Sequence, residues 1–259
     1  MHVVKKRDKM TTDMTKIIDR VITFPDKSFF LFGPRGTGKT TWINHTFPGA
    51  YSINLLDEAL YQSYLMDISL FAGEMRMLKK GDWVFIDEIQ RLPNLLNEVH
   101  RFIEEKGLKF ILTGSSARKL RMKGVNLLAG RALEKRMFPF LPEELGGSFD
   151  LEEVLTFGSI PLVWDSPDKR ETLSAYVRMY LKEEVKAEAL VRNLPGFVRF
   201  LSIAALFHAQ VINVSGLSRD AGVSRTTING YLEILEDTLL TFMLPAFGSR
   251  LRIREKKHP

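Results

Sequence analysis

The chain has 259 residues, of which 45% are hydrophobic and 26% charged, as is ordinary for a folded globular protein. No apolar stretch approaches the roughly 20 residues that a membrane-spanning helix needs, and the polar segment 1–16 lacks the apolar core of a signal peptide. The absence of cysteine excludes disulfides and thiolate metal sites and fits a cytoplasmic protein. The formal charge of +6 permits an anionic partner such as nucleic acid, but much of it lies in terminal segments that are typical of solvated tails.

The first half of the sequence predicts strands that alternate with helices. Residues 1–14 are expected to be disordered, and the apolar spacing in Thr15–Thr23 predicts an amphipathic helix. Continuous apolar runs are typical of strands that are buried on both faces of a sheet. The expected strands are Phe29–Phe32, Ala50–Leu55, Trp83–Ile86, Lys109–Thr113 and Leu133–Phe138, and the expected helices are Glu58–Lys80 and Leu95–Glu105. We therefore expect an α/β fold, with a parallel sheet and helices on both faces.

Residues Gly33–Thr40 read Gly-Pro-Arg-Gly-Thr-Gly-Lys-Thr and match the phosphate-binding loop G-x-x-x-x-G-K-[ST] at every fixed position. The match lies between an expected strand and an expected helix, which is the context that the motif requires. Its glycines let successive backbone N–H groups turn toward phosphates, Lys39 can reach the β- and γ-phosphates, and Thr40 offers a hydroxyl to Mg²⁺. The alternative is a glycine-rich turn without a chemical role. The expected nucleotide-binding residues are Gly33, Pro34, Arg35, Gly36, Thr37, Gly38, Lys39, Thr40 and Thr41.

The apolar run Trp83–Ile86 leads into two acidic residues, Asp87 and Glu88. Buried acids cost free energy unless a cation or proton chemistry uses them, and ligands bind at this end of the strands in an open parallel sheet. We expect Asp87 to orient Mg²⁺ and Glu88 to act as a general base toward water. A dedicated water-activating glutamate favours hydrolysis over phosphoryl transfer to a small molecule. An exposed acidic turn is the alternative.

The strand Lys109–Thr113 is followed by hydroxyl residues, Ser115 and Ser116. In a doubly wound sheet this strand would lie between the loop strand and the acidic strand. Either serine would then reach the γ-phosphate or the attacking water. The alternative is an N-cap for a helix that begins at Ala117, and both roles are compatible.

Together these motifs resemble one family, the prokaryotic AAA-domain ATPases that carry a second domain of uncharacterised function. The resemblance extends from about Ile17 to the end and rests on five motifs in the family's order: the loop, F-I-D-E-I-Q-R-L-P, L-T-G-S-S-A-R-K-L, L-L-A-G-R-A and F-P-F-L-P-E-E-L. It implies that Lys39 and Thr40 bind nucleotide and Mg²⁺. It also implies that Asp87 is the Walker B aspartate and Glu88 the catalytic glutamate.

The same resemblance implies two further catalytic residues. Ser115 or Ser116 would be the sensor of the γ-phosphate. Arg131, in Ala129-Gly130-Arg131, would be the arginine that stabilises charge on the transferring group, either within the chain or across an oligomer. For Arg131 the alternative is an ordinary surface ion pair.

The segment Leu217–Leu232 reads as a helix-turn-helix, in which Gly222 permits the turn and Ser224 caps the second helix. We expect Thr238–Leu244 to follow as the wing strand of a winged helix. Acidic residues such as Glu233 on later turns argue against DNA contact, and a packing or protein-contact role is the alternative. The expected DNA-contacting residues are Arg225, Thr226, Thr227 and Asn229.

The expected organisation has five parts. They are a disordered N-terminus (1–14), a P-loop ATPase core (15–147), a helical lid or linker (148–196), a winged-helix domain (197–248) and a basic tail (249–259). The relatives that the chain resembles continue beyond the winged helix, so a truncated product and a natural short form both fit. Nuclease-like chemistry of the segment that follows in those relatives is not assigned to this chain.

These features predict a cytoplasmic AAA-type enzyme that hydrolyses ATP with Mg²⁺ and couples the nucleotide state to movement of the winged helix. A homo-oligomer is compatible with this prediction, and a membrane partner is not expected. The first alternative is a nucleotide-gated DNA-binding regulator with little or no turnover. The second is a defective remnant, against which the intact loop and acidic pair argue.

Overall fold

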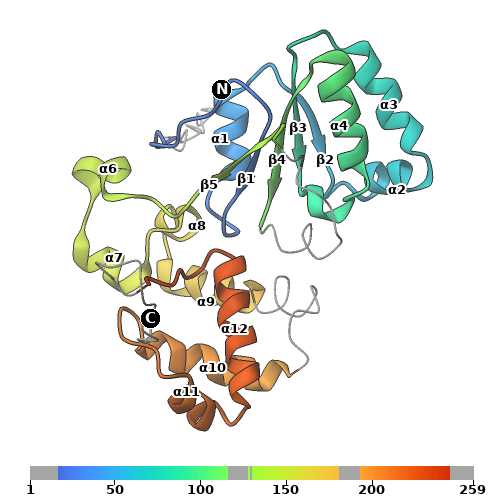
Figure 1. Cartoon of the computed structure of the whole chain (residues 1–259). Coiled ribbons are helices and arrows are strands. Elements are labelled where there is room, and N and C mark those ends of the chain that lie inside the picture. The colour runs from blue at the N-terminus through green and yellow to red at the C-terminus, as the bar shows by residue number, and fades with distance from the viewer. Residues whose placement is uncertain (1–16, 116–127, 129, 181–192, 246–259) are drawn as a thin grey trace, which may run out of the picture.

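The computed structural model describes residues 17–115, 128, 130–180 and 193–245. Its N-terminal part is a parallel five-stranded sheet in the order β2-β3-β4-β1-β5, so the predicted α/β fold is confirmed (Figure 1). As expected, β4 lies between the loop strand β1 and the acidic strand β3. The strands are β1 (Phe29–Phe32), β2 (Tyr51–Asn54), β3 (Trp83–Asp87), β4 (Lys109–Gly114) and β5 (Leu133–Arg136).

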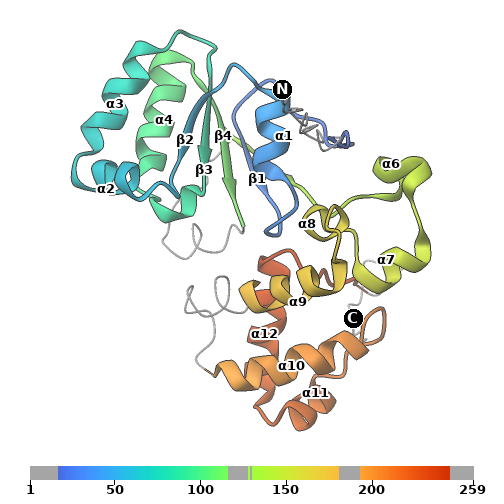
Figure 2. The ribbon, with the colours of Figure 1, turned by 180° about the vertical axis from the view of Figure 1, so that it is seen from behind.

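Helices cover both faces of the sheet because alternate residues of the central strands point to opposite sides (Figure 2). Phe29 and Leu31 of β1 pack with Trp42 of α1 on one face. Phe30 and Phe32 join a larger core on the other face, to which α2, α3 and α4 contribute. These helices are α1 (Lys39–Thr46), α2 (Glu58–Met66), α3 (Ile68–Met77) and α4 (Leu95–Lys106), with the short 3₁₀ helix η1 (Ile89–Arg91) between β3 and α4.

Two helix predictions for this part need correction. The single helix expected over Glu58–Lys80 is two helices, because extended backbone at Asp67 ends α2 and its carboxylate accepts the Ser69 N–H at 2.9 Å to begin α3. The helix expected over Thr15–Thr23 is absent from its described residues, which are irregular. Here the Val21 N–H donates to Glu144 instead of to a helical carbonyl.

The C-terminal part of the described chain is helical and lies beyond the C-terminal ends of the strands (Figures 1 and 2). We call α6 to α12 the helical part. Apolar side chains of α10, α11 and α12, among them Phe197, Leu217 and Ile228, form a core of their own. The elements are α6 (Pro142–Leu145), η2 (Gly146–Ser148), α7 (Leu151–Phe157), α8 (Pro161–Trp164), α9 (Lys169–Tyr180), α10 (Leu194–Leu206), α11 (Val214–Ala221) and α12 (Arg225–Asp237). Among the described residues, no helix is both long and apolar enough to span a membrane.

The expected helix-turn-helix corresponds to α11 and α12, but the wing strand predicted at Thr238–Leu244 is wrong. These residues form a turn and then irregular chain, and they pair with no strand in the part that the structure describes. Leu239 has a left-handed φ of 60°, and the Met243 N–H donates to Glu236 of α12 at 3.0 Å. The chain therefore folds back onto the end of the helix, which prevents it from extending as a strand.

Candidate nucleotide-binding site

The glycine-rich loop leaves β1 in a conformation that depends on its glycines. Gly38 has a left-handed φ of 81°, which most other residues avoid. A Cβ on Gly33 would lie 2.2 Å from the backbone oxygen of Met137, so only glycine fits there. Lys39 is buried, and its ammonium donates to the carbonyls of Gly33 at 2.7 Å and Pro34 at 3.1 Å. The lysine thus spans the concave side of the loop.

The loop runs into the N-terminus of α1, where Gly38 is the N-cap and no side chain caps the first backbone N–H groups. Helix N-termini attract anions because these groups point along the axis with their partial positive charge. The Thr37 hydroxyl is fully buried and donates to the Pro34 carbonyl at 2.8 Å, which closes the loop from within. The uncapped start of α1 and the Lys39 ammonium therefore belong to the same short loop.

Asp87 links this loop to the two central strands beside it. One carboxylate oxygen accepts the Thr40 hydroxyl at 2.8 Å, and the other accepts the Thr113 hydroxyl at 2.5 Å. Carboxylate and hydroxyl oxygens are the ligands that Mg²⁺ prefers, so Thr40 and Asp87 fit a magnesium ion whose other ligands are phosphate and water. In the described ranges, no three His, Cys, Asp or Glu residues gather as a metal cluster. The sequence did not lead us to predict that Thr113 contacts Asp87. A hydroxyl residue within an otherwise apolar buried strand could have indicated such a polar contact.

Glu88 follows with a left-handed φ of 58°, which is uncommon outside glycine. Burial raises the pKa of its carboxyl above the ordinary value, and the neighbouring charge of Asp87 raises it further. Lys39, Arg35 and a hydrogen bond from Gln90 act in the opposite direction. A carboxyl with a raised pKa is a stronger base once ionised.

Gln90 is a second residue that the sequence reasoning missed. Its amide nitrogen donates to Glu88, while its side-chain oxygen is buried and would lie 2.5 Å from a Cβ on Gly114. Gly114 therefore leaves the room that Gln90 needs to reach Glu88. No pattern in the sequence indicated this contact, because it depends on how η1 packs over the end of β4.

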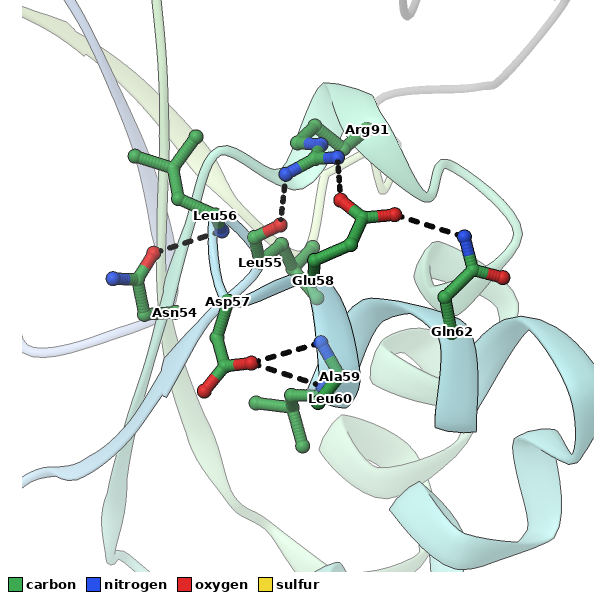
Figure 3. A network of polar contacts seen from close by, with 9 residues as sticks. All are labelled: Asn54, Leu55, Leu56, Asp57, Glu58, Ala59, Leu60, Gln62 and Arg91. Carbon is green, nitrogen blue, oxygen red and sulfur yellow. Dashed lines mark hydrogen bonds and ion pairs between the residues drawn. The ribbon is translucent and has the colours of Figure 1, made fainter.

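Arg91 ties the turn after Glu88 to the neighbouring connection between β2 and α2 (Figure 3). Its guanidinium donates to the Leu55 carbonyl at 2.7 Å and to Glu58 at 2.8 Å. Glu58 also accepts from Gln62 at 2.8 Å, so the network extends along α2 (Figure 3). These contacts hold η1 at the end of the sheet and thereby restrain the acidic pair.

The other expected site residues have different positions. Ser115 is buried directly after β4, and Ser116 lies outside the described residues. Arg131 forms an ion pair with Glu104 of α4. It precedes β5, whose first residue Leu133 pairs with the first residue of β1, so Arg131 lies at the N-terminal end of the strands, whereas the loop follows the C-terminal end of β1. The observed ion pair is the alternative expected for Arg131, and a role at the γ-phosphate stays a prediction.

A cavity of about 660 Å³ opens beside the loop, on the side of α1. The loop contributes Thr37 and Gly38 to its wall, and Thr41 is the predicted binding residue that lines it further along α1. The sequence reasoning missed most of this wall because its residues come from segments far apart in the chain. The remaining lining residues are Ile17, Ile18, Asp19, Arg20, Ile22, Phe24, Trp42, His45, Thr46, Phe140, Pro161 and Asp165.

The N-terminal and C-terminal parts of the chain match two different protein families. Residues 25–146 match the family described as an AAA domain. This match, together with the parallel sheet and its loop, supports an ATPase of the AAA type. Residues 148–259 match a domain of unknown function (DUF8612). The winged-helix assignment gains no support from that match.

The curated relatives share only a low sequence identity with this chain. The uncharacterized protein MJ1544 of Methanocaldococcus jannaschii is 26% identical over 92% of this chain and 61% of its own length. The uncharacterized protein Mb2031c of Mycobacterium bovis is 21% identical over 88% of this chain and 52% of its own. The chain thus spans about half to three-fifths of these relatives.

Two solved structures illustrate the structural likeness. The RuvB Holliday junction branch migration motor of Thermotoga maritima is 18% identical, with a TM-score of 0.35 over 83% of this chain and 79% of that one. The ORC2 protein of Aeropyrum pernix, in ADPNP–ADP complexes, is 14% identical, with a TM-score of 0.49 over 83% of this chain and 80% of that one.

Proposed function

We propose that this protein binds ATP together with Mg²⁺ and hydrolyses it. The observation that carries the proposal is the 2.8 Å hydrogen bond between the Thr40 hydroxyl and Asp87. It joins the first turn of the loop helix to the end of the acidic strand, 47 residues away in sequence. A phosphate held by the loop would therefore lie beside a carboxylate that suits a magnesium ion.

The loop residues bind and orient the phosphates in this proposal. The backbone N–H groups at the start of α1 donate to phosphate oxygens, and Lys39 exchanges its contacts with the loop carbonyls for the β- and γ-phosphates. Thr40 and Asp87 would hold Mg²⁺, which when bound would offset the negative charge of the phosphates. Arg35 adds a second positive charge close to Glu88.

Glu88 is the base in the proposed reaction. Its raised pKa and its position directly after Asp87 suit a carboxylate that accepts a proton from the attacking water. Gln90 holds this carboxylate through its amide and so restricts its orientation. Ser115, at the end of the strand between β3 and β1, remains the proposed contact to the γ-phosphate.

The nucleoside would occupy the cavity beside the loop. Ligand sites are typically concave and mostly apolar, with few polar groups, and Ile18, Trp42 and Phe140 give this cavity that character. Thr37 and Gly38 line both the cavity and the loop, so one nucleotide can reach both. Its base and ribose would then lie between α1 and the segment that precedes β1.

Measurement of phosphate release by the wild type and by Glu88→Gln tests hydrolysis. We expect turnover by the wild type and a loss of at least about a hundredfold in the variant, because the base is removed while binding remains. Equal rates for the two proteins would refute the enzymatic proposal. Lys39→Ala should abolish the rise in melting temperature that ATP causes in the wild type, and an unchanged rise would contradict the assignment of the loop.

The nucleotide state would be transmitted to the helical part through α8, whose Leu162 N–H donates to the Gly36 carbonyl of the loop at 3.3 Å.

In the alternative proposal, the protein is a nucleotide-gated regulator, and the exposed residues Arg225 and Asn229 at the start of α12 contact DNA. Phosphate contacts make DNA affinity fall steeply with salt. A DNA affinity that does not change with salt concentration would refute that alternative. Sedimentation with and without ATP tests whether the protein forms a homo-oligomer.

A further inference from the structure

Arg20 lies in the irregular segment before β1, yet its side chain is only 7% exposed. Its guanidinium donates in three directions, to Glu144 at 3.0 Å, to the Thr37 carbonyl at 2.8 Å and to the Phe138 carbonyl. It also lies over the ring of Phe140, 4.9 Å from the ring centre. One arginine therefore joins the N-terminal segment, the phosphate-binding loop and the chain that follows β5.

Glu144 completes this arrangement from α6, and its side chain is 3% exposed. One of its oxygens accepts the Val21 N–H at 2.9 Å in addition to Arg20, and the other accepts the Leu141 N–H at 3.0 Å. Burying a charge costs several kcal/mol unless it is paired and hydrogen-bonded, as both charges are here. Glu144 belongs to the motif F-P-F-L-P-E-E-L, to which the proposed reaction gives no role.

The contact with the Thr37 carbonyl has a consequence for the loop. A trans peptide unit is planar, so its C=O and the following N–H point in opposite directions. When Arg20 holds the Thr37 oxygen on the outer side, the Gly38 N–H must point to the inner side. The Gly36 carbonyl is held in the same way by the Leu162 N–H, which directs the Thr37 N–H inward. Such consecutive inward N–H groups form an anion-binding nest.

We propose that Arg20 is a positioning residue of the phosphate-binding loop, oriented by Glu144, and that this pair links phosphate binding to the start of the helical part. The proposal rests on the proposed nucleotide site. It assigns to Arg20 an effect on the phosphates rather than on the nucleoside, although Arg20 also lines the cavity. Inorganic tripolyphosphate and adenosine separate these two effects, because the first has no base and the second has no phosphate.

The experiment measures binding of magnesium tripolyphosphate and of adenosine by calorimetry to the full chain. Arg20→Met should weaken tripolyphosphate binding about tenfold or more, since a charge-assisted hydrogen bond to the loop is lost, and should change adenosine binding by less than about threefold. Glu144→Gln should produce part of the same loss. Combined with Arg20→Met it should add nothing, because the two residues act as a pair. Arg101→Met removes a partly exposed arginine–glutamate pair within α4 and should leave both affinities unchanged.

Tripolyphosphate binding within about twofold of the wild type in a folded Arg20→Met protein would overturn the proposal. Equal losses for adenosine and tripolyphosphate would also overturn it, because Arg20 would then act on the cavity. If Arg20→Met does not fold, Arg20→Lys decides, since it keeps the charge beside Glu144 but cannot donate in three directions. Unchanged tripolyphosphate binding by Arg20→Lys would contradict the proposal. A wild type that binds neither ligand refutes the nucleotide site itself.

Discussion

Thr113→Val is the substitution whose effect is most directly determined by the structure. Thr113 is fully buried in β4, and its hydroxyl donates to Asp87 at 2.5 Å. Valine has nearly the same shape, so the change replaces one donor by a methyl group and leaves the packing in place. The second oxygen of Asp87 keeps its bond from Thr40. The variant therefore removes the hydrogen bond to a buried carboxylate together with a longer contact of the same hydroxyl to the Ile86 carbonyl at 3.3 Å.

The expected magnitude follows from the charge and the burial of Asp87. A hydrogen bond to a charged group contributes about 1.5–3 kcal/mol, and removal of one donor leaves the acceptor desolvated. The free energy of unfolding of the sheet should fall by about that amount, and the melting temperature by about 2–4 °C per kcal/mol. Because Asp87 is the proposed magnesium ligand, ATP binding in the presence of Mg²⁺ should weaken about tenfold, and binding without Mg²⁺ should change little.

Guanidinium unfolding followed by tryptophan fluorescence measures the loss of stability, with signals from Trp42 and Trp83 in the sheet part and Trp164 in α8. Thr113→Ser keeps the hydroxyl and should restore magnesium-dependent binding. Thr156→Val makes the same chemical change at an exposed position of α7 and should alter stability by less than about 0.5 kcal/mol. A Thr113→Val protein as stable as the wild type, with unchanged magnesium dependence, would refute this reasoning.

Two further predictions concern the loop and the proposed base. Because the folded state raises the pKa of Glu88, ionising it costs stability as the pH rises through that raised value. Glu88→Gln should therefore melt above the wild type at pH 8 and lose this advantage as the pH falls below about 4.5, whereas a pH-independent difference in melting scans would contradict the assigned burial. Gly33→Ala should remove ATP binding and lower stability, since its Cβ would overlap the Met137 carbonyl. Gly49→Ala, where the Cβ meets no atom, is the control, and equal binding by both variants would show that the loop tolerates the side chain.

The sheet and the loop could be predicted from sequence because each depends on local information. Apolar runs such as Phe29–Phe32 require burial on both faces, and this requirement leads to a parallel sheet covered by helices. The glycine-rich loop is a short motif whose glycines determine the backbone. The acidic residues Asp87 and Glu88 at the end of β3 could be placed near the loop by the rule that ligands bind where parallel strands end.

The remaining contacts could not be predicted because they depend on tertiary packing. Arg20 and Glu144 are 124 residues apart, and neither stands out in the sequence as a charge that will be buried. Arg131 belongs to a motif that the chain shares with the family it resembles, but only the register of β5 shows at which end of the strands this residue lies. The mostly apolar segment Thr238–Leu244 was expected to form a strand. The left-handed turn at Leu239 prevents one, and no residue there signals it.

The position of the cavity has a consequence for how this protein should be divided into fragments. The AAA-domain match begins at residue 25, whereas the wall of the cavity starts at Ile17 and also includes Pro161 and Asp165, beyond the match's end at residue 146. An excised fragment 25–146 would keep the glycine loop and both acids but lose Arg20 and much of the cavity wall. Under the proposed function, the smallest fragment that binds a whole nucleotide should therefore extend beyond the AAA-domain match at both ends.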